Sequence, residues 1–312
     1  MMPGCRGQDS RFELLREVVR GPVRRQVPLA SYTSWRVGGP AEILVEPQDE
    51  DDAGRLFSVF HEHGWPWRLL GAGTNLLVAD RGVREVVVSL SALQGIEPLG
   101  PQQVRVGAGL LLSKLVKRCV ESGWQGIETL GGIPGTVGGA VTMNAGAGDQ
   151  TVGGCVLAAR VVEQGAVRDW PAQRFDFDYR HSAVTPEQAV LAVDFAFDAA
   201  EPAAVAQRHA VALAHRRRAQ AVHGANAGSV FKNPSRGSAW KLIDACGLRG
   251  VRRGGAQVAP EHANFIVNNG DASAADILGL IRQVQAEVYR RMGILLEPEV
   301  RLMGDFGEDH ES

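Results

Sequence analysis

Glycine is the residue that most constrains the fold of this chain. Thirty-eight of its 312 residues are glycine, and many of them lie inside well-patterned sequence rather than in low-complexity linkers. The densest block is GGIPGTVGGA, residues 131 to 140, and a smaller block, GAG, occupies residues 71 to 73. Glycine is entropically costly on folding and is used where φ is positive or the backbone approaches another group closely. Two such blocks therefore predict two specialised turns.

The first block matches only the start of a dinucleotide-binding fingerprint. Gly71 and Gly73 follow a strand-like segment, but Leu76 stands where the third glycine belongs and no helix is expected after it. Alone, this block is equally consistent with a plain turn. The second block favours a nest of backbone N–H groups that binds a pyrophosphate, although a strained packing crossover remains the alternative. Together they suit a diphosphate cofactor held between two lobes.

Composition limits the class of protein. A length of 312 residues allows two or three domains, with 45% hydrophobic and 22% charged residues, as in ordinary globular proteins. The net charge of −2 argues against nucleic-acid or anionic-membrane partners. No apolar run is long enough to span a membrane, and the N-terminal residues have no signal-peptide pattern. The four cysteines are scattered without metal spacing, which predicts reduced thiols in a cytoplasmic protein.

Periodicity along the chain predicts an α+β fold. Residues 41–46, 84–90, 102–109, 156–163 and 189–197 read as strands. Helical spacing is present at 51–64, 111–123, 203–221 and 273–293, and Ser273 with Asp276 forms a capping-box pattern that Gly293 closes. A last strand is expected within 294–304. Strand pairs and separate helices in this order favour α+β over strict βαβ winding.

The stretch NAGSVFKNP, residues 226 to 234, fits neither the hydrolase serine motif nor a phosphate loop. Ser229 follows small residues and precedes Lys232 and Asn233. A local turn or N-cap is the simplest interpretation of such a serine. An alternative is that the small residues make room for a ligand to approach the backbone.

Seven segments in a fixed order carry a resemblance to a known family. They are SYTSWRVGGPAE, LGAGTNLLVAD, GIETLGGIPGTVGGAVTMNAGAG, FDYRHS, NAGSVFKNP, GGAQVAPEHANFIVN and LEPEVR, between about residues 31 and 304. Each is a weak motif alone, but the ordered set resembles the UDP-N-acetylenolpyruvoylglucosamine reductases. The family contains FAD, uses NADPH, and reduces the enolpyruvyl ether of a UDP-sugar in peptidoglycan precursor synthesis.

The resemblance implies a two-lobed FAD-binding domain of the vanillyl-alcohol oxidase type and a smaller α+β substrate-binding domain. The implied limits are 1–80 and 81–203 for the two lobes, 204–297 for the substrate domain, and 298–312 for a strand and tail that return to the FAD domain. The residues implied to bind FAD lie in the two glycine blocks and just after the second: Gly71, Ala72, Gly73, Thr74, Asn75, Leu76, Gly131, Gly132, Pro134, Gly135, Gly138, Gly139, Ala140, Asn144 and Gly146.

Three residues match the catalytic positions of the family. Arg180, in FDYRHS, corresponds to the arginine that holds the substrate carboxylate and stabilises an enolate, a role that suits a planar, bidentate cation. Ser229 corresponds to the proton donor. Glu299 corresponds to the acid that assists protonation, and Glu297 is a neighbouring acid that competes for this assignment. On FDYRHS alone, a surface arginine is an equally good interpretation of Arg180.

Further residues are candidates for substrate binding: Arg217, Lys232, Asn233, Gln257 and His262. Arg217 belongs to a basic run that suits a diphosphate, or that complements a helix C-terminus. His262 has no other ligand at metal spacing, so no metal is expected.

The chain also departs from parts of the family. The interval between Arg180 and Ser229 is short and holds no tyrosine, which matches the type without a tyrosine-bearing insertion. Ala219-Gln220-Ala221 replaces a Lys-Gln-Pro found in many relatives of this type. A cytoplasmic monomer acting on a UDP-sugar is expected. A flavin oxidase of the same fold and a non-enzymatic nucleotide-binding protein are the competing hypotheses.

Overall fold

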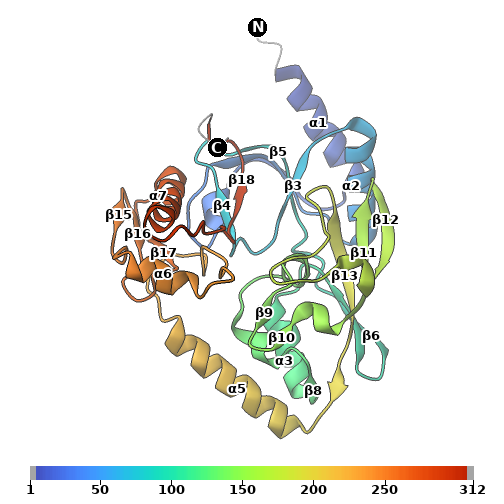
Figure 1. Cartoon of the computed structure of the whole chain (residues 1–312). Coiled ribbons are helices and arrows are strands. Elements are labelled where there is room, and N and C mark those ends of the chain that lie inside the picture. Colours follow the sequence, from blue (N-terminus) through green and yellow to red (C-terminus); the bar gives the residue numbers. More distant parts are fainter. Residues whose placement is uncertain (1–4, 308–312) are drawn as a thin grey trace. The chain divides into compact units, whose positions relative to one another are not determined.

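The computed structural model describes residues 5–307, with side chains described from Ser10 (Figure 1). Contacts divide the chain into two compact units. Unit 1 contains Met1–Gln26, Ile43–Ala72 and Glu85–His215, and unit 2 contains Val27–Glu42, Gly73–Arg84 and Arg216–Ser312. The chain therefore passes from one unit to the other several times, and some single elements belong to both.

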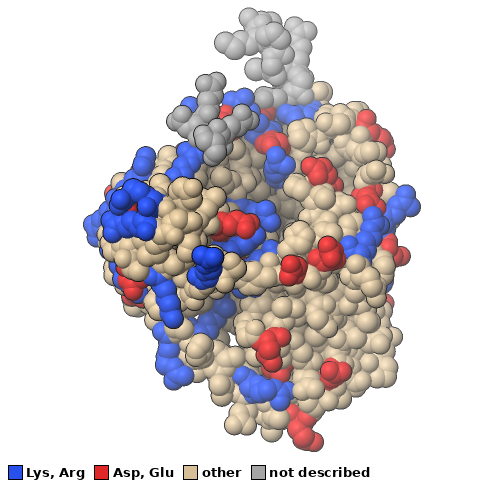
Figure 2. All heavy atoms as spheres, in the orientation of Figure 1, with Lys and Arg blue, Asp and Glu red and all other residues tan. Residues whose placement is uncertain are grey.

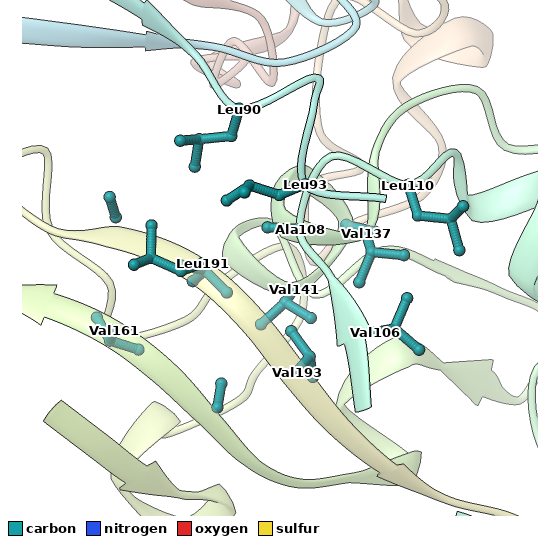
Figure 3. Packing of buried hydrophobic residues seen from close by; sticks show 14 of the residues in the cluster. Leu90, Leu93, Val106, Ala108, Leu110, Val137, Val141, Val161, Leu191 and Val193 are labelled. Carbon is teal, nitrogen blue, oxygen red and sulfur yellow. The ribbon is translucent and has the colours of Figure 1, made fainter. Parts of the chain in front are cut away.

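The main sheet of unit 1 has five strands in the order β12-β11-β13-β7-β6, all paired antiparallel. Val161, Leu191 and Val193 from this sheet lie in the same apolar core as Val137 and Val141 of the short helix α4 (Figure 3). The strands of the sheet are β6 (Ile96–Gly100), β7 (Gln103–Gly107), β11 (Val156–Glu163), β12 (Ala166–Pro171) and β13 (Ala189–Ala196).

A second sheet has the order β1-β2-β5-β3, in which β3 and β5 are parallel. Helix α2 begins at Asp49, whose carboxylate accepts from Asp52 N–H, and ends at Gly64 with φ of 61°. These elements are β1 (Val23–Pro28), β2 (Pro40–Val45), β3 (Trp67–Leu70), β5 (Val83–Ser89), α1 (Cys5–Val18) and α2 (Glu50–His63). Residues 112–219 contain further elements. The α-helices are α3 (Leu112–Glu121), α4 (Val137–Thr142) and α5 (Pro202–Ala219), and the 3-10 helices are η2 (Glu128–Gly132), η3 (Val152–Cys155) and η4 (Ala172–Phe175). The short strands are β8 (Trp124–Gln125), β9 (Gly146–Ala147), β10 (Gln150–Thr151) and β14 (Asp198–Ala199).

Unit 2 is built around helix α7, whose apolar face contributes Ile277, Ile281 and Val284 to a separate core. The capping box predicted at Ser273 and Asp276 is present, and Gly293 ends the helix in the left-handed region. The elements of this unit are η1 (Leu29–Tyr32), β4 (Leu76–Val78), α6 (Ala239–Ala245), β15 (Arg252–Arg253), β16 (Ala256–Val258), β17 (Ile266–Asn268), α7 (Ala274–Met292) and β18 (Arg301–Met303).

The predicted α+β class is confirmed, and each predicted helix and strand is present within a few residues of its expected limits. The one substantial difference is the last strand, which begins only at Arg301. Pro298 lacks an N–H and lies in the segment before it, where a regular ladder is interrupted. This irregular segment carries both candidate acids, Glu297 and Glu299.

Acidic and basic side chains are interspersed on the face shown in Figure 2, in keeping with the net charge of −2. Within residues 5–307, none of the helices combines the length and hydrophobicity that a membrane-spanning segment needs. Cys119, Cys155 and Cys246 are free thiols, and burial raises the pKa of Cys119 to about 12 and of Cys155 to about 11. The side chain of Cys5 lies outside the described part.

Candidate active site

The second glycine block forms the connection between η2 and α4 in unit 1. Backbone bonds attach it to the end of β7: Val137 N–H donates to Leu110 C=O at 2.8 Å, and Gly138 N–H donates to Ala108 C=O at 2.9 Å. A Cβ on Gly138 would lie only 2.9 Å from Ala108 Cβ. Packing alone therefore requires glycine at position 138.

An ion pair between a buried carboxylate and a partly exposed arginine supports the start of this block. Glu128 is 1% exposed, and its carboxylate accepts from Gly126 N–H and Arg208 Nε, both at 2.7 Å. The Glu128 carbonyl accepts from His209 Nδ1 at 2.8 Å, and a Cβ on Gly131 would overlap the His209 ring. Burial raises the pKa of Glu128, but these donors outweigh it and hold the pKa below its ordinary value. Helix α5 thus fixes η2 and leaves no room for a side chain at Gly131.

The two glycine blocks meet within unit 1. A Cβ on Gly71 would lie 3.3 Å from Thr136 Oγ1, and the same hydroxyl accepts from Gly139 N–H at 3.3 Å. Residues about 60 positions apart are thus neighbours. Thr136 therefore lies between Gly71 and Gly139 and brings the two blocks into contact.

Arg180 lies at a tight turn whose ends, Asp178 and His181, pair with each other. Its Nη2 donates to Gly146 C=O at 3.2 Å, and its guanidinium carbon is 5.3 Å from the centre of the Tyr179 ring. Asn144 Nδ2 donates to Asp178 C=O at 2.9 Å. The turn that carries the candidate arginine is therefore attached directly to the segment that follows the second glycine block.

Two of these residues have left-handed backbone without being glycine. Asn144 has φ of 40° and Arg180 has φ of 53°. Such conformations cost of order 1 kcal/mol or more and concentrate at functional sites. Asn144 is 5% exposed, and its Oδ1 also accepts from Gly153 N–H at 3.1 Å. The side chain of Asn144 therefore orders the loops around Arg180.

The end of the first glycine turn lies in unit 2. Gly73 has φ of 63°, and a Cβ there would overlap the Tyr32 carbonyl. Ser34 N–H donates to Gly73 C=O at 3.0 Å, while Ser34 Oγ is buried and lacks a hydrogen-bond partner among residues 5–307. A buried hydroxyl of this kind needs an acceptor. Ser34 is therefore a candidate for contact with a cofactor phosphate, and the sequence interpretation missed it.

Ser229 lies in an arc of unit 2 that is anchored at both ends. At one end Ala225 pairs with Asn268, and at the other Val230 N–H donates to Asn264 C=O at 2.8 Å. Gly228 has φ of 77°, and a Cβ on it would meet no atom within 4 Å. The space beside Gly228 is consistent with the ligand interpretation of the small residues. No hydrogen bond to Ser229 Oγ is found within the described part.

The extended segment that follows Ser229, residues 230–232, pairs through an isolated bridge with the segment that carries the two acids. Glu299 N–H donates to Val230 C=O at 2.8 Å, Lys232 N–H donates to Glu297 C=O at 2.9 Å, and Phe231 is opposite Pro298. Asn75, from the first glycine turn, donates through Nδ2 to Glu299 C=O at 3.0 Å. Unit 2 therefore brings Ser229, Glu299 and Asn75 into one connected group.

Glu297 and Glu299 differ in their surroundings. Residues two apart on an extended chain share a face, so alternation does not separate them. Glu297 is 69% exposed and pairs with Lys232 Nζ at 2.5 Å. Glu299 is half-buried, and its backbone is held on both sides. These differences favour Glu299 as the acid of the site.

The remaining substrate candidates have distinct local partners. Asn233 Oδ1 accepts from Ala239 N–H at 3.0 Å and so caps α6. Gln257 donates to Gly250 C=O at 3.1 Å, while Arg217 is exposed in the last turn of α5. His262 Nδ1 accepts from Asn264 N–H at 3.2 Å, and burial, followed by the charge of Arg249, lowers the His262 pKa. Within residues 5–307, no three His, Cys, Asp or Glu side chains are arranged to hold a metal ion.

Comparison with known proteins relates these features to a family. Residues 41–166 match a family model described as FAD binding domain, and residues 220–303 match one described as UDP-N-acetylenolpyruvoylglucosamine reductase, C-terminal domain. The curated UDP-N-acetylenolpyruvoylglucosamine reductase of Syntrophotalea carbinolica is 46% identical, over 93% of this chain and 97% of the relative. The relative from Geobacter metallireducens is 42% identical, over 95% and 99%. The crystal structure of the Thermus caldophilus reductase has a TM-score of 0.78 at 35% identity, covering 91% of this chain and 99% of that one.

Proposed function

Because the chain belongs to the UDP-N-acetylenolpyruvoylglucosamine reductase family, we propose that it uses NADPH to reduce UDP-N-acetyl-3-O-(1-carboxyvinyl)glucosamine to UDP-N-acetylmuramate. The chain is an FAD-containing oxidoreductase of peptidoglycan precursor synthesis. The observation that most supports the detailed reaction is the pairing of the segment that follows Ser229 with the segment of Glu299, since Ser229 and Glu299 are the two groups to which proton delivery is assigned.

FAD, when bound, supplies a hydride acceptor for NADPH and a hydride donor for the enolpyruvyl group. The residues that would hold it are those of the two glycine blocks, joined by Ser34. Its pyrophosphate suits backbone N–H groups at the Gly71–Leu76 turn and the Gly131–Gly139 loop, with Ala140, Asn144 and Gly146 nearby. The packing constraints on Gly73, Gly131 and Gly138 keep these turns free of side chains.

Arg180 is assigned to the charge that develops in the substrate. Hydride addition at the methylene carbon leaves negative charge that delocalises onto the carboxylate as an enolate. A fixed guanidinium stabilises that charge because its donors are oriented before the reaction. The left-handed backbone of Arg180 and its bond to Gly146 C=O supply this orientation.

Ser229 is assigned as the group that protonates the carbon next to the carboxylate, and Glu299 assists it. A free serine hydroxyl is a weak acid at neutral pH, so the assignment requires close placement beside the developing carbanion. The hydrogen bonds at Val230 and Glu299 restrain both backbones on either side of the reacting groups.

The substrate site extends in this proposal to Arg217, Lys232, Asn233, Gln257 and His262. The side-chain amides of Asn233 and Gln257 already bond to backbone groups of Ala239 and Gly250. In this proposal they bind the substrate through their remaining donors and acceptors, without breaking these bonds. The FAD lobes are assigned to residues 1–80 and 81–203, and the substrate domain to 204–297, followed by a returning segment, 298–312. We further propose a cytoplasmic monomer without nucleic-acid or membrane partners.

The visible spectrum of the purified protein tests this function. NADPH added without oxygen is expected to bleach the flavin absorbance, and the enolpyruvyl UDP-sugar is expected to restore it with formation of UDP-N-acetylmuramate. UDP-N-acetylglucosamine, which lacks the enolpyruvyl group, is the control and should restore nothing. Bleaching by NADPH without recovery on adding the substrate would contradict the proposed reaction. A protein that binds no FAD would instead support the nucleotide-binding hypothesis.

A further inference from the structure

The extended segment that follows Ser229, residues 230–232, has a different partner on each edge. On one edge, Val230 C=O and Lys232 N–H pair with Glu299 and Glu297. Because alternate residues of an extended strand direct their backbone groups to opposite edges, Phe231 N–H and C=O point away from this pairing. These two groups must find partners elsewhere, since Phe231 is 2% exposed and unpaired buried backbone groups are costly.

The partner on the other edge is a single side chain. Asn264 Oδ1 accepts from Phe231 N–H at 3.0 Å, and Asn264 Nδ2 donates to Phe231 C=O at 2.8 Å. The Asn264 carbonyl accepts from Val230 N–H at 2.8 Å. One carboxamide therefore replaces a neighbouring strand at the residues that directly follow Ser229.

Asn264 is held through its backbone as well as through its side chain. Asn264 is 4% exposed, and its own N–H donates to His262 Nδ1 at 3.2 Å. An asparagine side chain offers both a donor and an acceptor in one plane, which is the pattern that the two Phe231 groups require. Alanine lacks both groups, and aspartate keeps the size and the acceptor but loses the donor.

We propose that Asn264 is a positioning residue for protonation of the substrate: its carboxamide holds the extended segment after Ser229 and so fixes the hydroxyl against the reacting carbon. This inference rests on the proposed function. Asn264 acts through the Phe231 backbone, so its effect is confined to the step that needs Ser229. A small misplacement at that step is expected to be costly, since displacement by about 1 Å can reduce a rate about 100-fold.

Half-reactions measured by stopped flow separate this role from general stability. In Asn264→Ala, reoxidation of the NADPH-reduced flavin by the enolpyruvyl UDP-sugar should slow by about tenfold or more, while reduction of the flavin by NADPH stays within about twofold. Asn264→Asp is the milder variant and should show the same selectivity. Asp52→Asn is the matched control, because Asp52 is also buried and its side chain also holds backbone N–H groups, but those of Arg20, Gly21 and Gln48, which have no place in the proposed site. This control should leave both half-reactions within about twofold.

A double-mutant cycle tests whether Asn264 acts through Ser229. In a Ser229→Ala background, Asn264→Ala should slow reoxidation by no more than about a further twofold, because the group that it positions is already absent. Additive losses, or equal losses in both half-reactions, would overturn the inference. Failure of both Asn264 variants to fold would also overturn it, since Asn264 would then be a general stability determinant. If the wild-type protein shows no substrate-dependent reoxidation, the proposed function fails instead.

Discussion

Arg180 and Ser229 belong to different units, and the chain holds them by different means. The Arg180 turn closes within four residues, from Asp178 to His181, and its left-handed backbone and a bond to Gly146 C=O contribute to the orientation of Arg180. The extended segment after Ser229 depends on partners far along the chain, Glu299 on one edge and Asn264 on the other. This difference suits the proposed roles, because a charge that faces a carboxylate tolerates a local turn, whereas a weak acid needs restraint from several directions.

Ser229→Ala should produce the largest effect, and it tests the residue whose neighbours are restrained by several distant partners. We expect reoxidation by the substrate to fall by about 10³-fold, within the range for a positioned acid, while NADPH still reduces the flavin at the normal rate. Stopped-flow absorbance measures both steps. Equal losses in the two half-reactions would remove Ser229 from the role of proton donor.

Arg180→Lys tests the residue that is held by a local turn. Lysine keeps the charge but loses the planar pair of donors, and removal of one preorganised donor typically costs about 10²-fold. The loss should lie in the turnover rate with saturating substrate, and the FAD dissociation constant should stay near that of the wild type. Full activity in this variant would show that a point charge is sufficient.

Gly131→Ala tests whether packing, rather than a ligand, requires glycine in the second block. The new Cβ must displace His209 and break its bond to Glu128 C=O, at an expected cost of about 1–3 kcal/mol in the free energy of unfolding. Chemical denaturation measures the cost. Adding His209→Ala should recover part of it, and no recovery would show that the glycine serves another purpose.

The Glu128–Arg208 pair predicts a pH dependence of stability. The pKa of Glu128 is lowered on folding, so its contribution is present above the pKa of the unfolded carboxyl, about 4.3, and is lost as the pH falls through the folded value. Glu128→Gln should therefore lower the melting temperature at pH 7, through a loss of about 1–2 kcal/mol. The difference from wild type should shrink toward pH 3, and a constant difference would contradict the ionic contribution.

The Lys232–Glu297 pair should have the smallest effect. Glu297 is 69% exposed, and exposed ion pairs contribute under about 1 kcal/mol. Glu297→Gln should change the rate of reoxidation less than about threefold, since the backbone pairing of the two segments remains. A loss comparable with that of Ser229→Ala would reopen the assignment of Glu299 as the assisting acid.

The sequence by itself determined the local structure and the identity of the family. Glycine blocks, periodic apolar faces and the Ser273 capping box have causes within a few residues, and they predicted the α+β class and the helices α2, α3, α5 and α7 nearly to their limits. The helices α1 and α6 and the strands β1, β6 and β12 were not predicted. Seven short motifs in order were enough to indicate the family. Ser34 and Glu128 both lie inside family motifs, SYTSWRVGG and GIETLGG, so the motifs could have marked them as candidates. Nothing in these motifs specifies which groups the two side chains contact.

Only the tertiary structure decided which glycines are required by neighbours, and which distant groups hold the candidate catalytic residues. His209 excludes a side chain at Gly131, Asn264 takes the place of a strand beside Phe231, and Asn75 joins a glycine turn to Glu299. Each of these contacts joins residues at least 30 positions apart. No periodicity or propensity encodes them, because their geometry exists only when the chain has packed.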